Sequence, residues 1–239
     1  MKKWAIIFAV ISMNLWAQAP TNFSQAKKIA EKLFASNRQT LYCQCQFAQD
    51  KAVNLASCNM SQAQSIPRAE RIEWEHMMPA SYFGKDFACW REKLCVDKKG
   101  KRYKGRKCCE KIDPQFKQME AELYNLWPAD GLVNAKRSNY SYAQLYPVQN
   151  PKTHNFYGCP VVVDKVDHLF EPSDHSKGIV ARAMLFMSSH HGIALDQEVE
   201  NLMQYWHQKY PPSQREKQWG KQVAAVTGYA NPFITYSVL

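Results

Sequence analysis

The stretch RIEWEHMMPA (71–80) places a carboxylate directly before an imidazole, Glu75 next to His76. A carboxylate can hold a hard cation while a neutral imidazole takes a proton from water, so the pair suits metal-assisted hydrolysis. Adjacent residues on a regular strand point to opposite faces, so the two can serve one site only where the strand ends or bends. Pro79 favours such a break. Taken alone, the dipeptide fits a buried, mutually satisfied pair better than a site.

A second polar segment, NLWPADGLVNAKRSNYSY (125–142), carries three asparagines and two adjacent cations where a core segment would be apolar. An asparagine on a helix facing the Glu75–His76 strand could give one neutral amide oxygen to Mg²⁺. Most coordination positions would then remain for water and phosphate, as is usual for Mg²⁺ at phosphate-cleaving sites. The two segments together favour metal-assisted phosphate chemistry. A zinc protease is disfavoured, because no second histidine stands at ligand spacing.

The elements that must position these residues can be predicted in outline. Apolar spacing predicts helices over 22–34, with Asn22 or Ser24 as N-cap, and over 114–126. Further helices are predicted over 177–192, 195–210 and 213–227, and a strand over 161–170. Short strands and loops are expected in 41–75, and a charged loop in 97–111. No repeat, linker or domain boundary is visible, so we expect a single α+β domain.

The N-terminus indicates export. Lys2 and Lys3 precede an apolar run, and LWAQA supplies small residues for cleavage after Ala17 or Ala19. The run is short for a membrane span, which takes about 20 residues, so a signal peptide over 1–19 is favoured over an anchor. The remaining chain of about 220 residues suffices for one core. Without the leader's two lysines its net charge is +8, which suggests a polyanionic partner such as nucleic acid or an anionic surface.

All eight cysteines lie beyond the predicted leader, and an even count in an exported chain argues for disulfides. They are Cys43, Cys45, Cys58, Cys89, Cys95, Cys108, Cys109 and Cys159. Structural zinc sites favour cysteine pairs with two to four residues between them, whereas Cys43 and Cys45 have one residue between them and Cys108 and Cys109 have none. Spacing alone does not select a pairing.

Several motifs in order along the chain resemble those of bacterial endonuclease I, a family of periplasmic or secreted non-specific nucleases. The matching pieces are LYCQC (41–45), NLASC (54–58), WEHMMPA (74–80), GRKCC (105–109), MEAELYNLWPADGLVNAKRSN (119–139), YGCPVVVD (157–164), KGIVARAMLFMS (177–188) and NPFI (231–234). The resemblance implies an α+β fold with a disulfide-stabilised ββα-metal (His-Me finger) core. It also implies a Mg²⁺-dependent endonuclease acting on DNA, with RNA as a further substrate, and leaving 5′-phosphate ends. Mn²⁺ or Ca²⁺ remains an alternative metal.

The resemblance also implies roles for individual residues. His76 would be the general base, Glu75 and Asn134 the metal ligands, and Arg106 the phosphate clamp. These roles fit the chemistry, since phosphodiester attack loads negative charge onto oxygens that a cation and a guanidinium can stabilise. Asn125 would orient His76 or the substrate, or else cap a turn.

The sequence departs from the family pattern in one region. A cysteine usual near the last helix is absent, while EKLCVDKKGKRYK (92–104) looks like an insertion that brings Cys95. We hypothesise that a local Cys95–Cys108 bridge replaces the lost one, leaving Cys109 for Cys89. The inserted cations, including Lys101, Arg102 and Lys104, are expected to contact DNA phosphates, although charge runs are often merely solvated. Arg137 could touch DNA or form an internal ion pair.

Two histidine motifs receive structural interpretations. The run Ser173-Asp174-His175-Ser176 cannot align a catalytic triad, because its residues are consecutive, so Asp174 or Ser176 is expected to cap the next helix. The pair His190-His191 precedes Gly192 at a predicted helix C-terminus and is interpreted as surface. The expected protein is an exported, periplasmic or secreted, monomeric endonuclease without stable membrane association. The alternative is a non-catalytic basic module that binds nucleic acid or an anionic surface.

Overall fold

Helices and short strands alternate along the chain in a computed structural model that describes residues 18–145 and 156–235. The helices are α1 (Phe23–Leu33), α2 (Ala80–Gly84), α3 (Ala88–Arg91), α4 (Arg106–Ile112), α5 (Pro114–Glu120), α6 (Gly131–Arg137), α7 (Asp174–His191), α8 (Gln197–Lys209), α9 (Gln214–Thr227) and α10 (Pro232–Thr235). The strands are β1 (Gln46–Phe47), β2 (Val53–Asn54), β3 (Ile72–His76), β4 (Cys95–Val96), β5 (Arg102–Tyr103), β6 (Leu126–Asp130), β7 (Ser141–Tyr142), β8 (Val162–Asp164) and β9 (Leu169–Glu171). Short 3₁₀ turns are η1 (Leu55–Cys58), η2 (Ser61–Ala63) and η3 (Leu123–Asn125).

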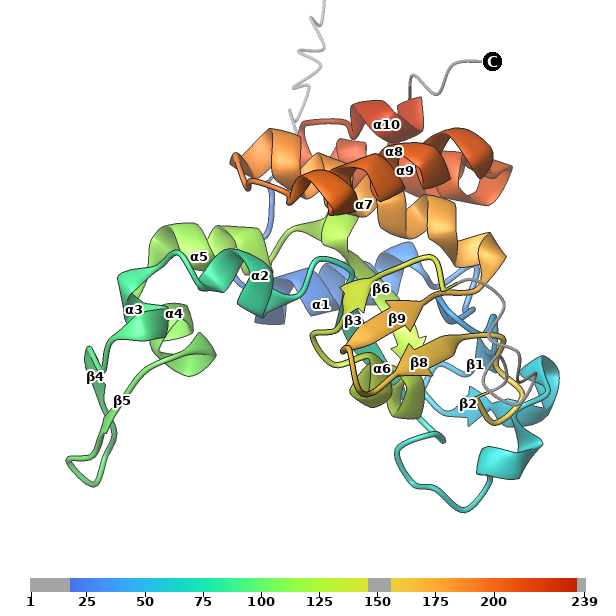
Figure 1. The fold of residues 1–239 in the computed structure, drawn as a ribbon, viewed down its shortest axis with the longest axis horizontal. Coiled ribbons are helices and arrows are strands. Elements are labelled where there is room, and N and C mark those ends of the chain that lie inside the picture. Colours follow the sequence, from blue (N-terminus) through green and yellow to red (C-terminus); the bar gives the residue numbers. More distant parts are fainter. Residues whose placement is uncertain (1–17, 146–155, 236–239) are drawn as a thin grey trace, which may run out of the picture.

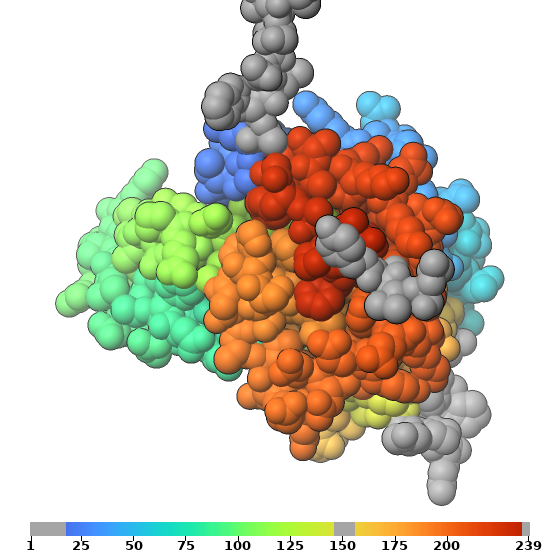
Figure 2. All heavy atoms as spheres, turned by 90° about the horizontal axis from the view of Figure 1, so that it is seen from above, coloured from blue at the N-terminus to red at the C-terminus, as the bar shows by residue number. Residues whose placement is uncertain are grey.

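The arrangement is a mixed α+β domain, as expected (Figure 1). The helices α7 to α10 form a layer on one side of the β3–β6 pair, and α2 to α5 extend sideways with the β4–β5 hairpin. Figure 2 shows the helical layer face on, with the C-terminal helices in orange and red at the centre of the visible surface. No helix in the described part of the chain is long and apolar enough to cross a membrane. Residues 1–17 of the predicted signal peptide lie outside the described residues.

The pair β3–β6 and the helix α6 form the structural centre of the fold. The strands are antiparallel, with Glu75 opposite Trp127 and His76 opposite Leu126. The strand β6 is buried along its whole length. The helix α6 follows at once, because Asp130 Oδ1 accepts hydrogen bonds from the first free amides of the helix. A Cβ on Gly131 would lie 2.4 Å from the backbone oxygen of Arg68, so only glycine fits at this turn.

The predicted helix over 114–126 is correct only in its first half. Asp113 caps α5 and Pro114 occupies its first turn, as the sequence favours. The chain then passes through η3 into β6, which pairs with β3. Pro128 cannot lie in a helix interior, and this residue stands opposite Trp74 in the strand pair.

The helices predicted at both ends of the chain are confirmed. Asn22 caps α1 through a hydrogen bond from the Gln25 amide. The helices α7, α8 and α9 cover the predicted C-terminal segments, and Gly192 ends α7 in a left-handed conformation. The N-cap of α7 is Ser173, so the prediction of Asp174 or Ser176 at this position was wrong.

The predicted strand over 161–170 is two strands. Asp164 Oδ1 accepts from the backbone amides of Val166 and Asp167, which closes a turn between β8 and β9. The expectation of short strands and loops in 41–75 is confirmed. The segment 97–111 is less irregular than predicted, because it contains β5 and most of α4.

Four disulfides use all eight cysteines, which excludes cysteine ligation of zinc. They join Cys43 to Cys159, Cys45 to Cys58, Cys89 to Cys109 and Cys95 to Cys108. The hypothesised Cys95–Cys108 and Cys89–Cys109 bridges are therefore confirmed. The Cys95–Cys108 bridge fastens the inserted segment to α4, and the Cys89–Cys109 bridge joins α3 to α4. The inserted residues form the β4–β5 hairpin that projects from the body (Figure 1).

Candidate active site

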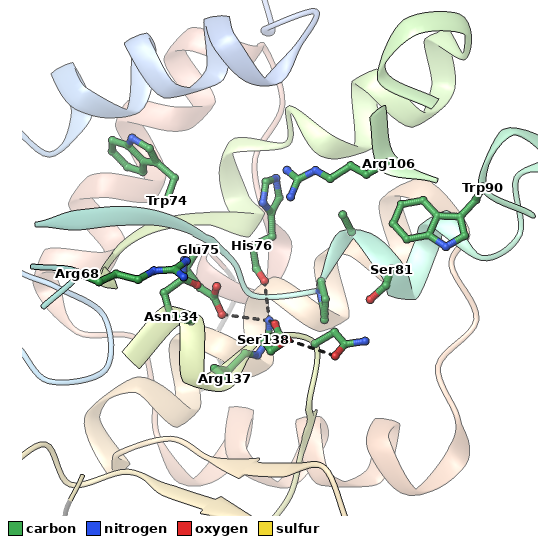
Figure 3. Close-up of a pocket in the computed structure, with 14 residues that line it drawn as sticks. Arg68, Trp74, Glu75, His76, Ser81, Trp90, Arg106, Asn134, Arg137 and Ser138 are labelled. Carbon is green, nitrogen blue, oxygen red and sulfur yellow. Dashed lines mark hydrogen bonds and ion pairs between the residues drawn. The ribbon is translucent and has the colours of Figure 1, made fainter. Parts of the chain in front are cut away.

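A polar pocket of about 470 Å³ opens where β3 ends, between α6 on one side and α4 on the other (Figure 3). Its lining brings together Glu75, His76, Arg106 and Asn134, which are far apart in sequence. The other lining residues are Arg68, Trp74, Pro79, Ala80, Ser81, Trp90, Ala135, Arg137, Ser138 and Asn139. The four residues to which the resemblance gives catalytic or metal-binding roles thus share one cavity.

The His76 side chain occupies the last position of β3 and points toward Arg106 (Figure 3). Its Nε2 lies 2.7 Å from the backbone oxygen of Glu120. A carbonyl only accepts hydrogen bonds, so the contact assigns the proton to Nε2 and leaves the lone pair on Nδ1. Burial, with a further contribution from the Arg106 charge, lowers the pKa of His76 to about 3. The imidazole is therefore neutral at physiological pH.

Glu75 points to the opposite side of β3, toward α6 (Figure 3). Its carboxylate is buried, and Oε1 accepts from the Tyr42 hydroxyl at 2.7 Å and pairs with Arg137 Nη1 at 3.1 Å. No hydrogen bond in the described part of the chain reaches Oε2. Burial raises the pKa of Glu75, while the Arg137 guanidinium opposes that shift. One carboxylate oxygen is thus held by the protein and the other is available as a ligand.

Asn134 projects from α6 next to Glu75 (Figure 3). Its Nδ2 donates to Glu73 Oε2 at 3.0 Å, which fixes the orientation of the amide. The same carboxylate receives two hydrogen bonds from Arg68, at 2.8 and 2.9 Å. With its nitrogen committed, Asn134 can offer its amide oxygen as a neutral ligand.

Arg106 is the first residue of α4 and reaches back toward His76 (Figure 3). Its Nε lies 2.5 Å from Glu120 Oε1 and 3.3 Å from Glu110 Oε1. Its terminal nitrogens, Nη1 and Nη2, form no hydrogen bond with the residues that the structure describes. The side chain is 38% exposed, so this end of the guanidinium is accessible to an anion entering the pocket.

Arg137 is not the free cation that a substrate contact requires. Its side chain is 1% exposed and pairs with Glu75. Its guanidinium also donates to the backbone oxygens of His76 at 3.1 Å and Met77 at 2.5 Å. The predicted substrate-binding role is therefore corrected to the internal ion pair that was its alternative. Arg137 holds Glu75 and the end of β3 in place.

Of the alternatives predicted for Asn125, contact with the substrate finds no support in the structure. The residue is fully buried and does not line the pocket. Its Oδ1 accepts from the Met78 amide at 2.6 Å and its Nδ2 donates to the Met78 oxygen at 3.0 Å. Its own backbone oxygen accepts from the Met77 amide. Asn125 thus fastens the chain directly after His76, and so orients the histidine without contacting the cavity.

The cations of the β4–β5 hairpin do not line the pocket. Arg102 Nε donates to the Lys93 oxygen at 3.1 Å, and Lys104 Nζ donates to the Arg91 oxygen at 2.9 Å. The Lys101 side chain is exposed. These three residues therefore belong to a separate basic surface on the projecting hairpin.

Sequence reasoning missed several residues that line or support the pocket. Trp74 and Trp90 line its walls, and Arg68 and Glu73 orient Asn134. The alternation of acids and arginines in RAERIEWEH (68–76) was the available indication, because on one face of β3 it brings Glu73 and Glu75 toward α6. Which partner each acid finds depends on α6, which is distant in sequence.

Comparison with known proteins places the chain in a family. The model of the family Endonuclease I matches residues 21–237. The chain therefore belongs to the endonuclease I family, a family of nucleases.

Individual relatives agree over most of their length. An extracellular deoxyribonuclease of Aeromonas hydrophila is 33% identical, with 94% of this chain and 92% of the relative covered. A periplasmic deoxyribonuclease of the same species is also 33% identical, covering 94% and 90%. Endonuclease-1 of Buchnera aphidicola subsp. Acyrthosiphon pisum is 33% identical, covering 89% and 80%.

Proposed function

We propose that this protein is an exported endonuclease that hydrolyses phosphodiester bonds of DNA without reading sequence. The observation that carries the proposal is the convergence of His76, Glu75, Asn134 and Arg106 on one pocket in a member of a nuclease family. Relatives named as extracellular and periplasmic deoxyribonucleases support DNA as substrate and export to the periplasm or medium. The predicted leader supports export as well, with the mature domain beginning near residue 20. RNA is a further substrate in this proposal.

The proposed core is a ββα-metal unit made of β3, β6 and α6. In this unit β3 supplies Glu75 and His76, and α6 supplies Asn134. Support comes from the antiparallel pairing of the two strands and from the immediate continuation of β6 into α6. A site built on regular elements holds its side chains more precisely than a site on loops.

The donor atoms in the pocket fit a hard divalent cation, and we propose Mg²⁺. A carboxylate oxygen of Glu75 and the amide oxygen of Asn134 are hard ligands, and two protein ligands suit an ion that keeps water and phosphate in its remaining positions. The free Oε2 of Glu75 and the fixed amide of Asn134 support this assignment. When bound, the ion stabilises the negative charge that develops on the phosphate oxygens.

His76 would act as the general base through Nδ1. Its Nε2–H is held by the Glu120 oxygen, so the lone pair of Nδ1 remains available for a proton from water. The water oxygen then attacks phosphorus as its proton moves to Nδ1. The bond between phosphorus and the 3′ oxygen breaks, and the leaving 3′ oxygen takes a proton from solvent water. The products are a 3′-hydroxyl and a 5′-phosphate.

Arg106 would bind the scissile phosphate through its terminal nitrogens. Its Nε is occupied by Glu120 and Glu110, which holds the guanidinium in place beside His76. A guanidinium fixed in this way stabilises charge on the phosphate in the transition state without reorganising.

Away from the pocket, the duplex would be held through its phosphates, with Lys101, Arg102 and Lys104 of the hairpin among the contacts. Such contacts bind without reading sequence, which fits a non-specific enzyme. All proposed catalytic groups come from one chain, so we propose that the protein acts as a monomer.

A plasmid-nicking assay on the oxidised mature protein tests the proposal. We expect nicking in Mg²⁺, none in EDTA, and none in His76→Ala, while His168→Asn, outside the pocket, retains activity. DNA binding without cleavage by the wild-type protein would contradict the proposal. It would favour the alternative, a basic binding module on the same scaffold, for which net charge alone suffices.

A further inference from the structure

A second group of metal-binding side chains lies outside the pocket, where the end of α7 meets the segment between α5 and η3. Glu122, His190 and His191 each offer one ligand atom, and the three atoms lie within 4.8 Å of one another. His191 Nε2 is 3.3 Å from Glu122 Oε2. Ligands of a tetrahedral zinc ion with bonds of about 2.0–2.1 Å stand about 3.3–3.4 Å apart, so this pair already has the required separation.

The neighbouring residues hold the cluster in position. Glu122 is 2% exposed, and its Oε1 accepts from the Tyr124 amide at 3.0 Å. Its Oε2 accepts from the Tyr229 hydroxyl at 2.8 Å. The His190 ring is stacked on Phe186, with centroids 4.8 Å apart, and on Tyr229, with centroids 4.6 Å apart. Outer contacts that orient ligands in this way raise the affinity of metal sites.

A simple ion pair accounts for only part of this arrangement. An ion pair with Glu122 at the C-terminus of a helix involves only His191, so it does not explain the position of His190. Within the described residues, neither ring nitrogen of His190 forms a hydrogen bond. His190 thus places an imidazole without such a partner beside the buried Glu122 carboxylate. The two histidines were interpreted as surface residues. His190 is exposed, as expected, whereas His191 is only partly exposed.

We propose that Glu122, His190 and His191 bind one late first-row divalent cation of the Zn²⁺ class, with an open fourth position facing solvent. Two imidazoles and a carboxylate suit Zn²⁺, whereas the all-oxygen donors of Glu75 and Asn134 suit Mg²⁺. An ion here would join the end of α7 to the segment that follows α5. That segment adjoins Glu120, whose backbone oxygen holds His76. The second ion would therefore brace the part of the chain that positions the proposed base.

Zinc titration of the metal-stripped, oxidised mature protein tests this inference. We would measure Zn²⁺ affinity by competition with a chromogenic chelator in excess Mg²⁺, and the Zn²⁺-induced change in Tm. All proteins would carry Glu75→Gln, so that the catalytic pocket contributes no carboxylate ligand. We expect one bound Zn²⁺, a rise in Tm, and visible absorption bands when Co²⁺ replaces Zn²⁺.

The variants separate this site from adventitious binding. His190→Ala with His191→Ala should raise the Kd for Zn²⁺ at least about tenfold and abolish the Tm shift and the Co²⁺ bands. His168→Asn, the control, should change neither. His190→Ala alone changes only an exposed side chain, so this variant should still fold. It therefore tests the site if the double variant does not fold. Unchanged Zn²⁺ affinity in a folded His190 variant would overturn the proposal, independently of any result on nicking.

Discussion

Asn134 Nδ2 donates to Glu73 Oε2 at 3.0 Å, and this hydrogen bond determines which atom of the amide can face a metal ion. Because Glu73 is held by Arg68, the orientation of Asn134 depends on a carboxylate that does not line the pocket. The proposed ligand and the residue that orients it can therefore be tested separately.

Removing the ligand or its support should weaken Mg²⁺ binding by different amounts. Asn134→Ala removes a ligand oxygen, and Glu73→Gln removes the charged acceptor that orients it. We expect Glu73→Gln to raise the Mg²⁺ concentration for half-maximal nicking by about 10–100-fold, and Asn134→Ala by at least as much. Asn201→Ala on α8 serves as the matched control. An unchanged Mg²⁺ requirement in Asn134→Ala would remove this residue from the metal site.

Arg106 should matter more for turnover than for binding. Arg106→Ala removes the fixed guanidinium, and we expect single-turnover cleavage at saturating DNA to fall by about 10²–10³-fold. Arg106→Lys should restore little of the cleavage rate. Lysine has a single side-chain nitrogen, so it cannot bind the two glutamates and the phosphate through separate nitrogens as arginine does. Lys107→Ala, at the next position of α4, is the control. A loss confined to DNA affinity would instead indicate a general electrostatic contact.

Arg137 should contribute to stability through its buried pair with Glu75. Arg137→Met leaves the Glu75 carboxylate buried without its partner, and we expect a loss of about 3–5 kcal/mol in the free energy of unfolding by urea. Adding Glu75→Gln to Arg137→Met should recover part of that loss, since the unpaired charge is gone. If the double variant is as unstable as the sum of the two single ones, the pair is not coupled as the 3.1 Å contact indicates.

The projecting hairpin should change the salt dependence of DNA binding. Replacing Lys101, Arg102 and Lys104 by glutamine should flatten the slope of log K against log salt by about 0.9 for each phosphate that is no longer neutralised. Single-turnover cleavage at low salt should stay mostly intact, because the pocket is untouched. The matched control replaces Lys209, Lys217 and Lys221 on α8 and α9, which removes the same charge elsewhere. If the two triple variants had the same slope of log K against log salt, the hairpin cations would not contact DNA and would only be solvated.

Local sequence predicted the terminal helices well, because their caps and apolar spacing lie within the segments themselves. Asn22 before α1 and Gly192 after α7 are examples. Prediction failed where a distant partner decided the conformation. The helix predicted over 114–126 ends at Glu120, since the chain then turns through η3 to bring Leu126 into β6, opposite His76 of β3.

The sequence by itself determined the chemical groups of the candidate site and the even set of cysteines, and its motifs indicated the family. It suggested the Cys95–Cys108 bridge only as a hypothesis, which the structure confirms. These inferences follow from residue types and from motifs that are contiguous along the chain. Only the tertiary structure decided that Arg137 is an internal partner of Glu75, that Asn125 is buried outside the pocket lining, and that Glu122 lies close to two histidines of α7. Each of these contacts joins residues far apart in sequence, so the environment of each polar group depends on how the elements pack and not on its neighbours in the chain.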